Sequence, residues 1–226
     1  MEKESKIRTK FKLVDLIVFS SYYVFCLLLF LSLTGLFKKE LIILGFVAGF
    51  LFWLWVRPKI EFIKSKKQYL YFFILIPILF IGILLIKGAF NGDGINYWLP
   101  WSREIVLQER MPDFLLNSRG WLTSRMPLMP LFYAGIFSFL GFQDWVIAVL
   151  PLFFSAATVF LIYQWLLEKG VAKKYIIFGI LLLLTNPLFL NLGGEAAQEP
   201  FILFFFTAFF YYLEKSQETK RPLYFL

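Results

Sequence analysis

Long apolar stretches separated by short polar links run through the whole chain. A helix needs about 20 mainly apolar residues to cross the hydrocarbon core of a bilayer, and most of these stretches approach or exceed that length. The pattern therefore predicts an all-α, polytopic transmembrane helical bundle with about six spans and additional juxtamembrane helices on the outer side. The apolar stretches cover residues 13–36, 41–56, 69–90, 127–140, 145–167, 175–192 and 200–213.

The composition is typical of a membrane protein, and it excludes several kinds of catalytic site, metal site and cross-link. Of the 226 residues, 60% are hydrophobic, whereas soluble domains are about half apolar. The chain has no histidine, which excludes Ser-His-Asp catalysis, histidine proton relays and histidine metal sites. Its single cysteine, Cys26, cannot form an internal disulfide. A net charge of +8 is also typical of proteins that bind nucleic acid, but in this chain the basic residues lie between apolar stretches. Membrane topology explains them better, and no nucleic-acid partner is expected.

The basic residues predict how the chain lies in the membrane. Five precede the first apolar stretch and five lie in the link at 57–67, and cytoplasmic segments are enriched in lysine and arginine. Both segments, and hence the N-terminus, should therefore be cytoplasmic, and we expect the membrane to be the plasma membrane. If residues 127–140 do not cross, two clusters after residues 168 and 214 also fall inside, and 16 of the 23 basic residues become cytoplasmic. That stretch is also short, and two prolines interrupt its start, so we predict a re-entrant or juxtamembrane helix on the outer side.

The only long polar-rich segment, at residues 91–125, opens with Asn91-Gly92-Asp93-Gly94. By the predicted topology it lies outside, on the same face as residues 193–199. A carboxylate just outside a span, between two glycines that let other groups approach the backbone, is the best candidate for a reactive group. Gly-Asp-Gly is also typical of a simple turn at a helix end, and short motifs often match by chance. Local sequence alone leaves both interpretations open.

After this motif the pattern predicts an interfacial helix that starts near Pro100, because proline is well tolerated in a first helical turn. The helix either anchors a loop or contributes to a substrate site. The residues expected toward lipid are Trp101, Ile105 and Leu107, those expected in water are Arg103, Glu104 and Glu109, and an aromatic belt at the outer boundary is expected from Trp98, Trp101, Trp121 and Trp145.

Five short motifs follow one another along the second two thirds of the chain. They are Asp93 with Tyr97 four residues later, Arg125-Met126-Pro127-Leu128-Met129-Pro130, Leu140-Gly141-Phe142 before Trp145, Asn186-Pro187-Leu188-Phe189, and Glu199-Pro200 before an aromatic stretch. Their order resembles that of the GT-C glycosyltransferases that use lipid-phosphate sugars, which include protein O-mannosyltransferases and the aminoarabinose transferases of lipid A. Each motif is weak alone, so the resemblance, over roughly residues 70–226, rests on order and spacing.

The chain departs from the pattern of this family at three places. Family members often carry a second acid directly after the first, where this chain has Gly94. They often carry an arginine about five residues before an aspartate in the second loop, where it has Gly194 and Glu199. Many also carry an arginine early in the next span, where it has Val149. The differences concern residues that would bind phosphate and supply a second acid.

The resemblance implies a membrane glycosyltransferase that moves a sugar from a polyprenyl-phosphate-linked donor to an acceptor hydroxyl of a lipid, glycan or protein on the outer face. Asp93 would be the general base, because a carboxylate desolvated near the bilayer surface has a raised pKa. Arginines suit the donor phosphate, although they also bind lipid head groups. The pattern requires no metal, but acids on the outer face could hold Mg²⁺ or Mn²⁺. The expected substrate-binding residues are Tyr97, Arg103, Arg125, Glu195 and Glu199.

The chain is expected to have two parts. Residues 1–68 form two extra N-terminal transmembrane helices and a basic cytoplasmic link, and residues 69–226 form the N-terminal part of a GT-C-like transmembrane catalytic domain. Because residues 222–226 read as the start of another span, we expect the domain to continue beyond them and this chain alone to be inactive. The alternative is a non-catalytic polytopic membrane subunit or a transporter-like protein. Transporters usually place ionisable groups at mid-membrane, and these apolar stretches hold almost none.

Overall fold

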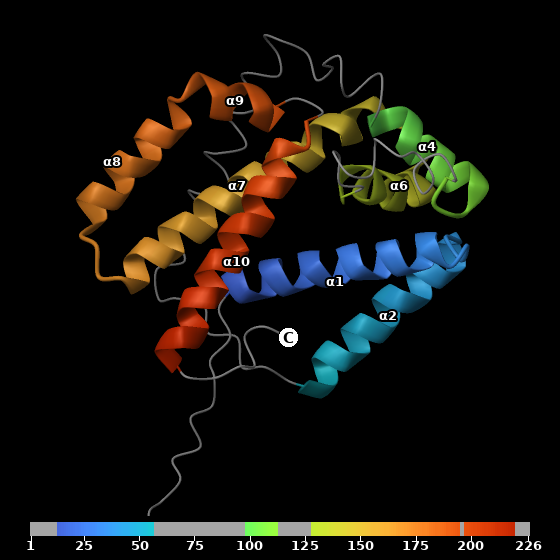
Figure 1. Ribbon diagram of the computed structural model, residues 1–226, viewed down its shortest axis with the longest axis horizontal. Coiled ribbons are helices and arrows are strands. Elements are labelled where there is room, and N and C mark those ends of the chain that lie inside the picture. Colours follow the sequence, from blue (N-terminus) through green and yellow to red (C-terminus); the bar gives the residue numbers. More distant parts are fainter. Residues whose placement is uncertain (1–12, 57–97, 113–127, 195–196, 220–226) are drawn as a thin grey trace, which may run out of the picture.

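The computed structural model describes residues 13–56, 98–112, 128–194 and 197–219, and all regular structure in these ranges is helical (Figure 1). The expectation of an all-α chain is confirmed for these residues. The predicted span at 69–90 and four of the predicted site residues lie outside them. The helices are α1 (Leu13–Leu33), α2 (Lys39–Val56), α4 (Leu99–Gln108), α6 (Leu128–Leu140), α7 (Asp144–Glu168), α8 (Lys173–Leu184), α9 (Pro187–Gly194) and α10 (Glu199–Thr219).

Most of the predicted apolar stretches in the described ranges fold into helices close to the expected bounds, namely α1, α2, α6, α7 and α10. Among the described helices, α1 and α7 are long and apolar enough to cross a bilayer. α6 has 13 residues. At 1.5 Å per residue it is about 20 Å long, which is too short for a hydrocarbon core of about 30 Å. The total of about six spans stays a prediction.

The stretch 175–192, expected to form one span, is broken. α8 ends before Asn186, and α9 begins at Pro187 and turns away from α8 (Figure 1). Proline lacks an N–H and its ring clashes with the preceding turn, so it suits a first helical position and not a helix interior. The side-chain oxygen of Asn186 accepts hydrogen bonds from the backbone N–H groups of Leu188 at 2.9 Å and Phe189 at 3.4 Å, as an N-cap does.

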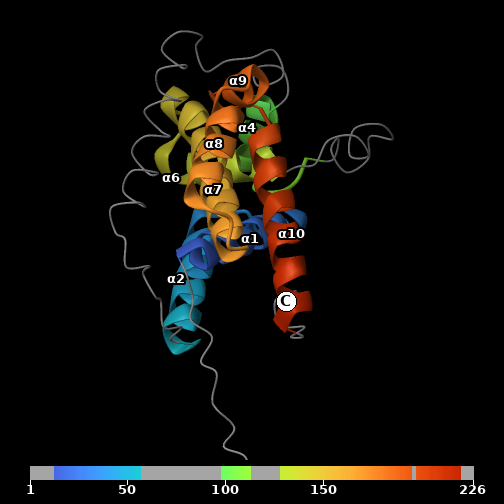
Figure 2. The ribbon, with the colours of Figure 1, turned by 90° about the vertical axis from the view of Figure 1, so that its left-hand side faces the viewer.

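α7 packs along α10, and α1 and α6 lie against this pair (Figure 2). Phenylalanine rings fill the core that these helices enclose. The ring centre of Phe154 on α7 lies 4.5 Å from that of Phe201 on α10 and 5.1 Å from that of Phe132 on α6. Phe25 of α1 stacks on Phe132 at 6.5 Å. Such pairs add to the free energy gained by burying the rings. α1 is therefore part of one core with α6, α7 and α10, and the domain boundary at residue 68 stays a prediction.

One end of the bundle, called here the carboxylate end, is made by Asp15 of α1, Glu168 of α7 and Glu214 of α10. The buried carboxylate of Asp15 accepts a hydrogen bond from the hydroxyl of Tyr212 at 2.6 Å and pairs with the ammonium of Lys215 at 3.3 Å. The first turn of α1 and the C-terminal part of α10 are thereby joined. α7 ends beside them, because its last turn contacts α10 through Glu168 and Tyr211 at 3.0 Å.

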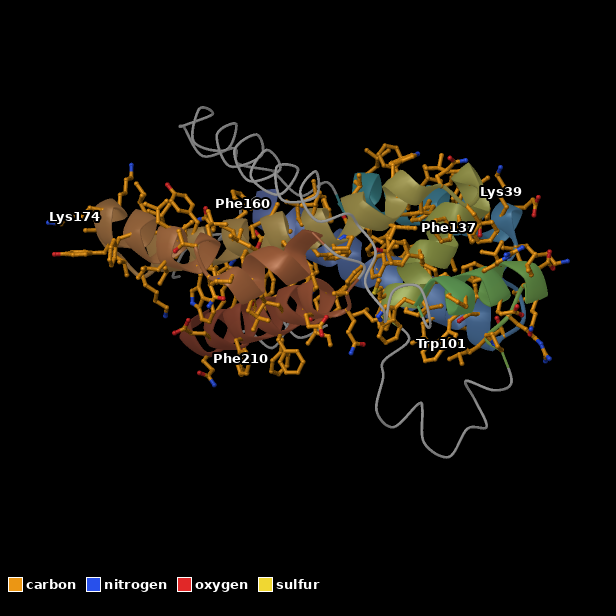
Figure 3. All side chains as sticks on the ribbon, turned by 90° about the horizontal axis from the view of Figure 1, so that it is seen from above. Lys39, Trp101, Phe137, Phe160, Lys174 and Phe210 are labelled. Atoms are coloured by element: carbon orange, nitrogen blue, oxygen red, sulfur yellow. The ribbon has the colours of Figure 1, made fainter. Side chains whose placement is uncertain are left out.

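The opposite end, called here the loop end, holds α4, the turn at residues 141–143 and the start of α10. Figure 3 shows Lys39, Phe137 and Trp101 at this end and Lys174 at the far end of the molecule. Lys169, just after α7, and Lys215, inside α10, thus lie at the same end of the bundle as the first turn of α1. This is the arrangement that the predicted topology requires if α6 does not carry the chain across the membrane.

Candidate functional site

α4 packs one face against α6 at the loop end. Its start is organised by Trp98 and Trp101, which are buried and whose rings meet edge to face at 5.4 Å. The hydroxyl of Ser102 donates a 2.6 Å hydrogen bond to the carbonyl of Trp98, and Ile105 is fully buried one turn further on. Residues three and four apart lie on one face of a helix. The tryptophans and Ile105 therefore form the packed face, and the charged residues point away from it.

This packing corrects the expected lipid-facing surface. Trp101 and Ile105 contact protein and not lipid, and Trp98 and Trp101 belong to the core and not to an aromatic belt. Leu107 and Trp145 are exposed, at 61% and 55%. The fourth tryptophan of the expected belt lies outside the described residues. The reason is that α6 covers α4, and nothing local to α4 indicates that a neighbouring helix will lie there.

The other end of α4 is tied to the link between α1 and α2. Glu109 adopts a left-handed conformation with φ of 54°, and its carbonyl accepts a 2.8 Å hydrogen bond from the N–H of Phe37. The N–H of Met111 donates to the carbonyl of Ser32 at 2.7 Å. The exposed ion pair between Lys38 and Glu109, at 3.5 Å, adds little because water screens it. The two backbone hydrogen bonds are thus what hold α4 beside α1.

α6 and the following turn form the floor of the loop end. Tyr133 is fully buried and donates its hydroxyl to the carbonyl of Ile147 at 2.6 Å, which fastens α6 to α7. α6 ends at Gly141, whose φ of +72° is a left-handed conformation that glycine adopts without strain. The turn then presents Phe142, which is 47% exposed and lies 5.0 Å from the buried ring of Phe137.

Arg103 is a candidate residue that the structure describes, and its surroundings are defined by a contact with an aromatic ring. It lies on the exposed face of α4, and its Cζ is 5.7 Å from the centre of the Phe142 ring. On the same helix the side-chain amide of Gln108 donates to the carboxylate of Glu104 at 2.8 Å. The exposed face of α4 therefore presents a guanidinium directly beside the turn between α6 and α7.

Glu199, the second described candidate, is the first residue of α10 and is exposed. The next two residues are buried, and the ring of Phe201 lies 6.3 Å from that of Tyr133 on α6. An acid in a first helical turn is favoured by the helix dipole, so a purely structural role for Glu199 remains an alternative. The structure brings Arg103 and Glu199 to the loop end, on two helices that both pack against α6.

The remaining predicted site residues, Asp93, Tyr97, Arg125 and Glu195, lie outside the residues that the structure describes. Within the described ranges, no group of three or more acidic, cysteine or histidine side chains could hold a metal ion. Of the acids expected to bind Mg²⁺ or Mn²⁺, Glu199 alone is described. The metal expectation therefore stays a prediction.

A polar network at the carboxylate end was missed by sequence reasoning. The hydroxyl of Tyr211 donates to both carboxylate oxygens of Glu168 at 3.0 Å, and the amide of Gln164 donates to the same carboxylate at 3.0 Å. Gln164 and Glu168 are four residues apart, a spacing at which side chains meet on a helix. That spacing, at the end of an apolar stretch, was a usable signal. The network joins helices far from the loop end and has no place in the candidate site.

Glu214 completes this network on α10. Its carboxylate binds the ammonium of Lys169 and the indole N–H of Trp165, both on or just after α7. The hydrogen bond from Lys169, followed by that from Trp165, lowers the pKa of Glu214 below its ordinary value, because both stabilise the charged carboxylate. α7 and α10 are thus held together by charge at the end opposite the candidate site.

Comparison with protein families connects this arrangement to known chemistry. Residues 112–225, half of the chain, match the family described as dolichyl-phosphate-mannose-protein mannosyltransferase. The chain belongs to this family. The mannosyltransferase family consists of membrane glycosyltransferases, so the resemblance and the enzyme class expected from the sequence are confirmed. No curated protein and no solved structure matches the chain.

Some of the predicted site residues lie within the range matched by the mannosyltransferase family, and the others precede it. It includes Arg125, Glu195 and Glu199, and it begins after Asp93, Tyr97 and Arg103. The helices that it covers are α6, α7, α8, α9 and α10. The family match therefore supplies the floor of the loop end and the start of α10, whereas α4 with Arg103 packs onto that floor from outside the matched region.

Proposed function

We propose that this chain forms part of a transferase that moves a sugar from a polyprenyl-phosphate-linked donor to an acceptor hydroxyl on the outer face of the membrane. One observation carries the proposal: α6 and the start of α10, both matched by the mannosyltransferase family, meet α4 at the loop end, so that Arg103 and Glu199 lie on neighbours of the same helix, α6. Proteins of the family use a lipid-linked sugar donor and a protein acceptor, so a mannosyl donor and a protein hydroxyl are the first substrates to test.

The length of chain supports the same location for the other candidates. Asp93 precedes the first residue of α4 by six positions, Arg125 precedes that of α6 by three, and Glu195 precedes that of α10 by four. Because a chain extends by at most about 3.6 Å per residue, Asp93 can be no more than about 22 Å from the start of α4. Each candidate is thereby tethered by a short piece of chain to a helix of the loop end.

The chemistry assigns a role to each kind of residue. The oxygen of the acceptor hydroxyl forms a bond to the anomeric carbon of the sugar, and the bond from that carbon to the phosphate oxygen breaks. The hydroxyl proton passes to the carboxylate of Asp93, and the polyprenyl phosphate leaves with the electron pair. Positive groups that bind the leaving phosphate stabilise the transition state, and arginine can do so with two parallel hydrogen bonds. Arg103 and Arg125 are the arginines assigned to this task, with Tyr97, Glu195 and Glu199 orienting the substrates.

We also assign the loop end to the outer face and the carboxylate end to the cytoplasm, with the N-terminus inside and the plasma membrane as the location. The support is the distribution of basic residues, since Lys169, Lys173 and Lys174 follow α7 and Lys215 lies near the end of α10, where it pairs with Asp15. Segments on the cytoplasmic side are enriched in such residues. A protein acceptor would then be glycosylated after export.

The test uses the full-length protein in nanodiscs with a labelled polyprenyl-phosphate mannose and peptide, glycan or lipid acceptors. Asp93→Asn keeps the size of the side chain and cannot accept the proton, so sugar transfer should fall about 10²–10⁴-fold. Asp113→Asn, which makes the same change in the same polar segment, should leave transfer within about twofold of the wild type. Wild-type turnover by Asp93→Asn would remove Asp93 from the mechanism. A wild-type protein that binds the donor but transfers sugar to none of these acceptors would favour the non-catalytic subunit.

A further inference from the structure

Phe142 is an exposed aromatic residue whose position the apolar core does not explain. It stands in the short turn between α6 and α7 and is 47% exposed, although its ring touches the buried ring of Phe137 at 5.0 Å. Gly141 directly before it has φ of +72°, and this left-handed residue ends α6 and sets the direction of the turn. The ring is therefore held from behind by Phe137 and aimed by a special backbone conformation toward α4.

The face of this ring is occupied by Arg103, whose Cζ lies 5.7 Å from the ring centre. A guanidinium is attracted to an aromatic face by the electrons of the ring. Arginine makes this contact with its plane, and its N–H donors at the edge stay available for a second partner. The donors are arranged as a fork that matches the oxygens of a phosphate or a carboxylate. A guanidinium held in this way is ready to bind an anion with little further ordering.

We propose that Phe142 is a positioning residue that holds Arg103 for the phosphate of the polyprenyl-phosphate donor. The inference rests on the proposed function for its reaction, but the phosphate binding that it describes can be measured without turnover. Arg103 is the cationic residue that contacts the phosphate, and Phe142 acts through Arg103 by limiting the orientations of the guanidinium. Pre-ordering of this kind raises affinity because less side-chain freedom is lost on binding.

Two kinds of molecule carry a phosphate that Arg103 can bind, namely the donor and the lipid head groups of the surrounding bilayer, and the experiment must distinguish them. Donor recognition predicts that binding of sugar-free polyprenyl phosphate in nanodiscs of phosphatidylcholine depends on Arg103 and on the Phe142 ring. Recognition of head groups predicts that phosphatidylglycerol added to the nanodiscs competes fully with polyprenyl phosphate. It also predicts that the variants lose affinity for phosphatidylglycerol to the same extent as for polyprenyl phosphate. The first result supports the inference, and the second overturns it.

Four variants separate positioning from packing. Phe142→Leu keeps an apolar side chain and removes the ring face, and Phe142→Trp keeps an aromatic face. Arg103→Lys keeps the charge and loses the planar fork. Phe139→Leu is the matched control, because Phe139 lies three residues earlier and its ring is under Lys39, at 5.8 Å, and not under Arg103. All four are assayed for polyprenyl-phosphate affinity, donor KM, acceptor KM and kcat.

We expect Phe142→Leu to weaken polyprenyl-phosphate binding and raise donor KM about two- to fivefold, the range of an exposed cation–aromatic contact. The acceptor KM should not change, Phe142→Trp should retain wild-type values, and Phe139→Leu should do the same. Arg103→Lys should lose at least as much affinity as Phe142→Leu. A merely structural role would reduce kcat and both KM values together and would not be rescued by tryptophan.

The outcomes for the two proposals are separable. Unchanged polyprenyl-phosphate affinity in both Phe142→Leu and Arg103→Lys overturns the positioning role, even if Asp93→Asn abolishes transfer. Absence of sugar transfer by the wild type overturns the proposed function, while ring-dependent phosphate binding by the same protein would still support the role of Phe142. Wild-type binding in Phe142→Leu combined with weak binding in Arg103→Lys would show that Arg103 binds phosphate without help from the ring.

Discussion

The hydroxyl of Tyr133 on α6 donates a 2.6 Å hydrogen bond to the carbonyl oxygen of Ile147 on α7. In an uninterrupted helix this carbonyl would accept from the N–H four residues later. Residue 151 is a proline inside α7 and has no N–H to donate. The side chain of one helix therefore supplies the partner that the backbone of another lacks. This contact holds α6 against α7 beneath the loop end, where the position of α6 sets that of α4.

Removal of the Tyr133 hydroxyl should be costly only while Pro151 is present. Tyr133→Phe leaves the Ile147 carbonyl buried without its donor, which should lower the free energy of unfolding by about 1–2 kcal/mol. In a Pro151→Ala background the restored N–H can bond to Ile147, so the same change should cost much less. Unfolding by sodium dodecyl sulfate in mixed micelles measures all four proteins of the cycle. Equal costs in both backgrounds would show that the hydroxyl does not substitute for the missing N–H.

The contact between α1 and α2 depends on the absence of a side chain at Gly49. A Cβ there would lie 2.6 Å from the ring of Tyr23, whose hydroxyl also donates to the carbonyl of Gly45 at 2.6 Å. Gly49→Ala should therefore destabilise the protein by about 1–3 kcal/mol, as overpacking does. Gly179→Ala on α8 is the control, because a Cβ at Gly179 meets nothing within 4 Å and alanine favours a helix. Equal melting temperatures for the two variants would contradict close packing of α1 on α2.

The Glu214 carboxylate should stabilise the protein in a pH-dependent way. Its pKa is lowered in the folded protein, so the charged form contributes stability above the unfolded-state pKa of about 4.5, and this contribution is lost as pH falls through the lower folded-state value. Glu214→Gln should therefore melt at a lower temperature than wild type at pH 7, by a small amount because the pair is partly exposed. The difference should shrink as the pH falls below 4.5. Lys169→Met should reproduce this behaviour, and a difference that is constant with pH would rule out the charge as its cause.

The two turns that flank α7 should lie on opposite sides of the membrane. Gln143 and Ala172 are both exposed and stand just before and just after α7. In a Cys26→Ala background, Gln143→Cys should react with a membrane-impermeant maleimide in intact cells, and Ala172→Cys should react only after the cells are permeabilised. The reverse pattern would invert the proposed orientation. Reaction of both cysteines from outside would show that α7 does not cross the membrane.

The sequence by itself determined where most of the helices lie and which family the chain belongs to. Apolar stretches of sufficient length could fold only as helices in a bilayer, because their backbone groups have no water to bind. The order of short motifs was enough to indicate a GT-C glycosyltransferase before any contact was known. Local chemistry also explains the break in the stretch 175–192, since Asn186 caps the new helix and Pro187 cannot continue the old one. A count of apolar residues alone does not detect this break.

Only the tertiary structure decided which faces of these helices meet. α1 and α7 are apolar all round, so their sequences do not distinguish a face toward protein from a face toward lipid. The burial of Trp101 under α6 and the bond from Tyr212 to Asp15, 197 residues apart, follow from that packing. The contact of Arg103 with Phe142 likewise needs α4 and the α6–α7 turn to be neighbours. In a membrane, packing of side-chain shapes and the pairing of polar groups select among faces that are equally apolar, and neither can be read from one helix alone.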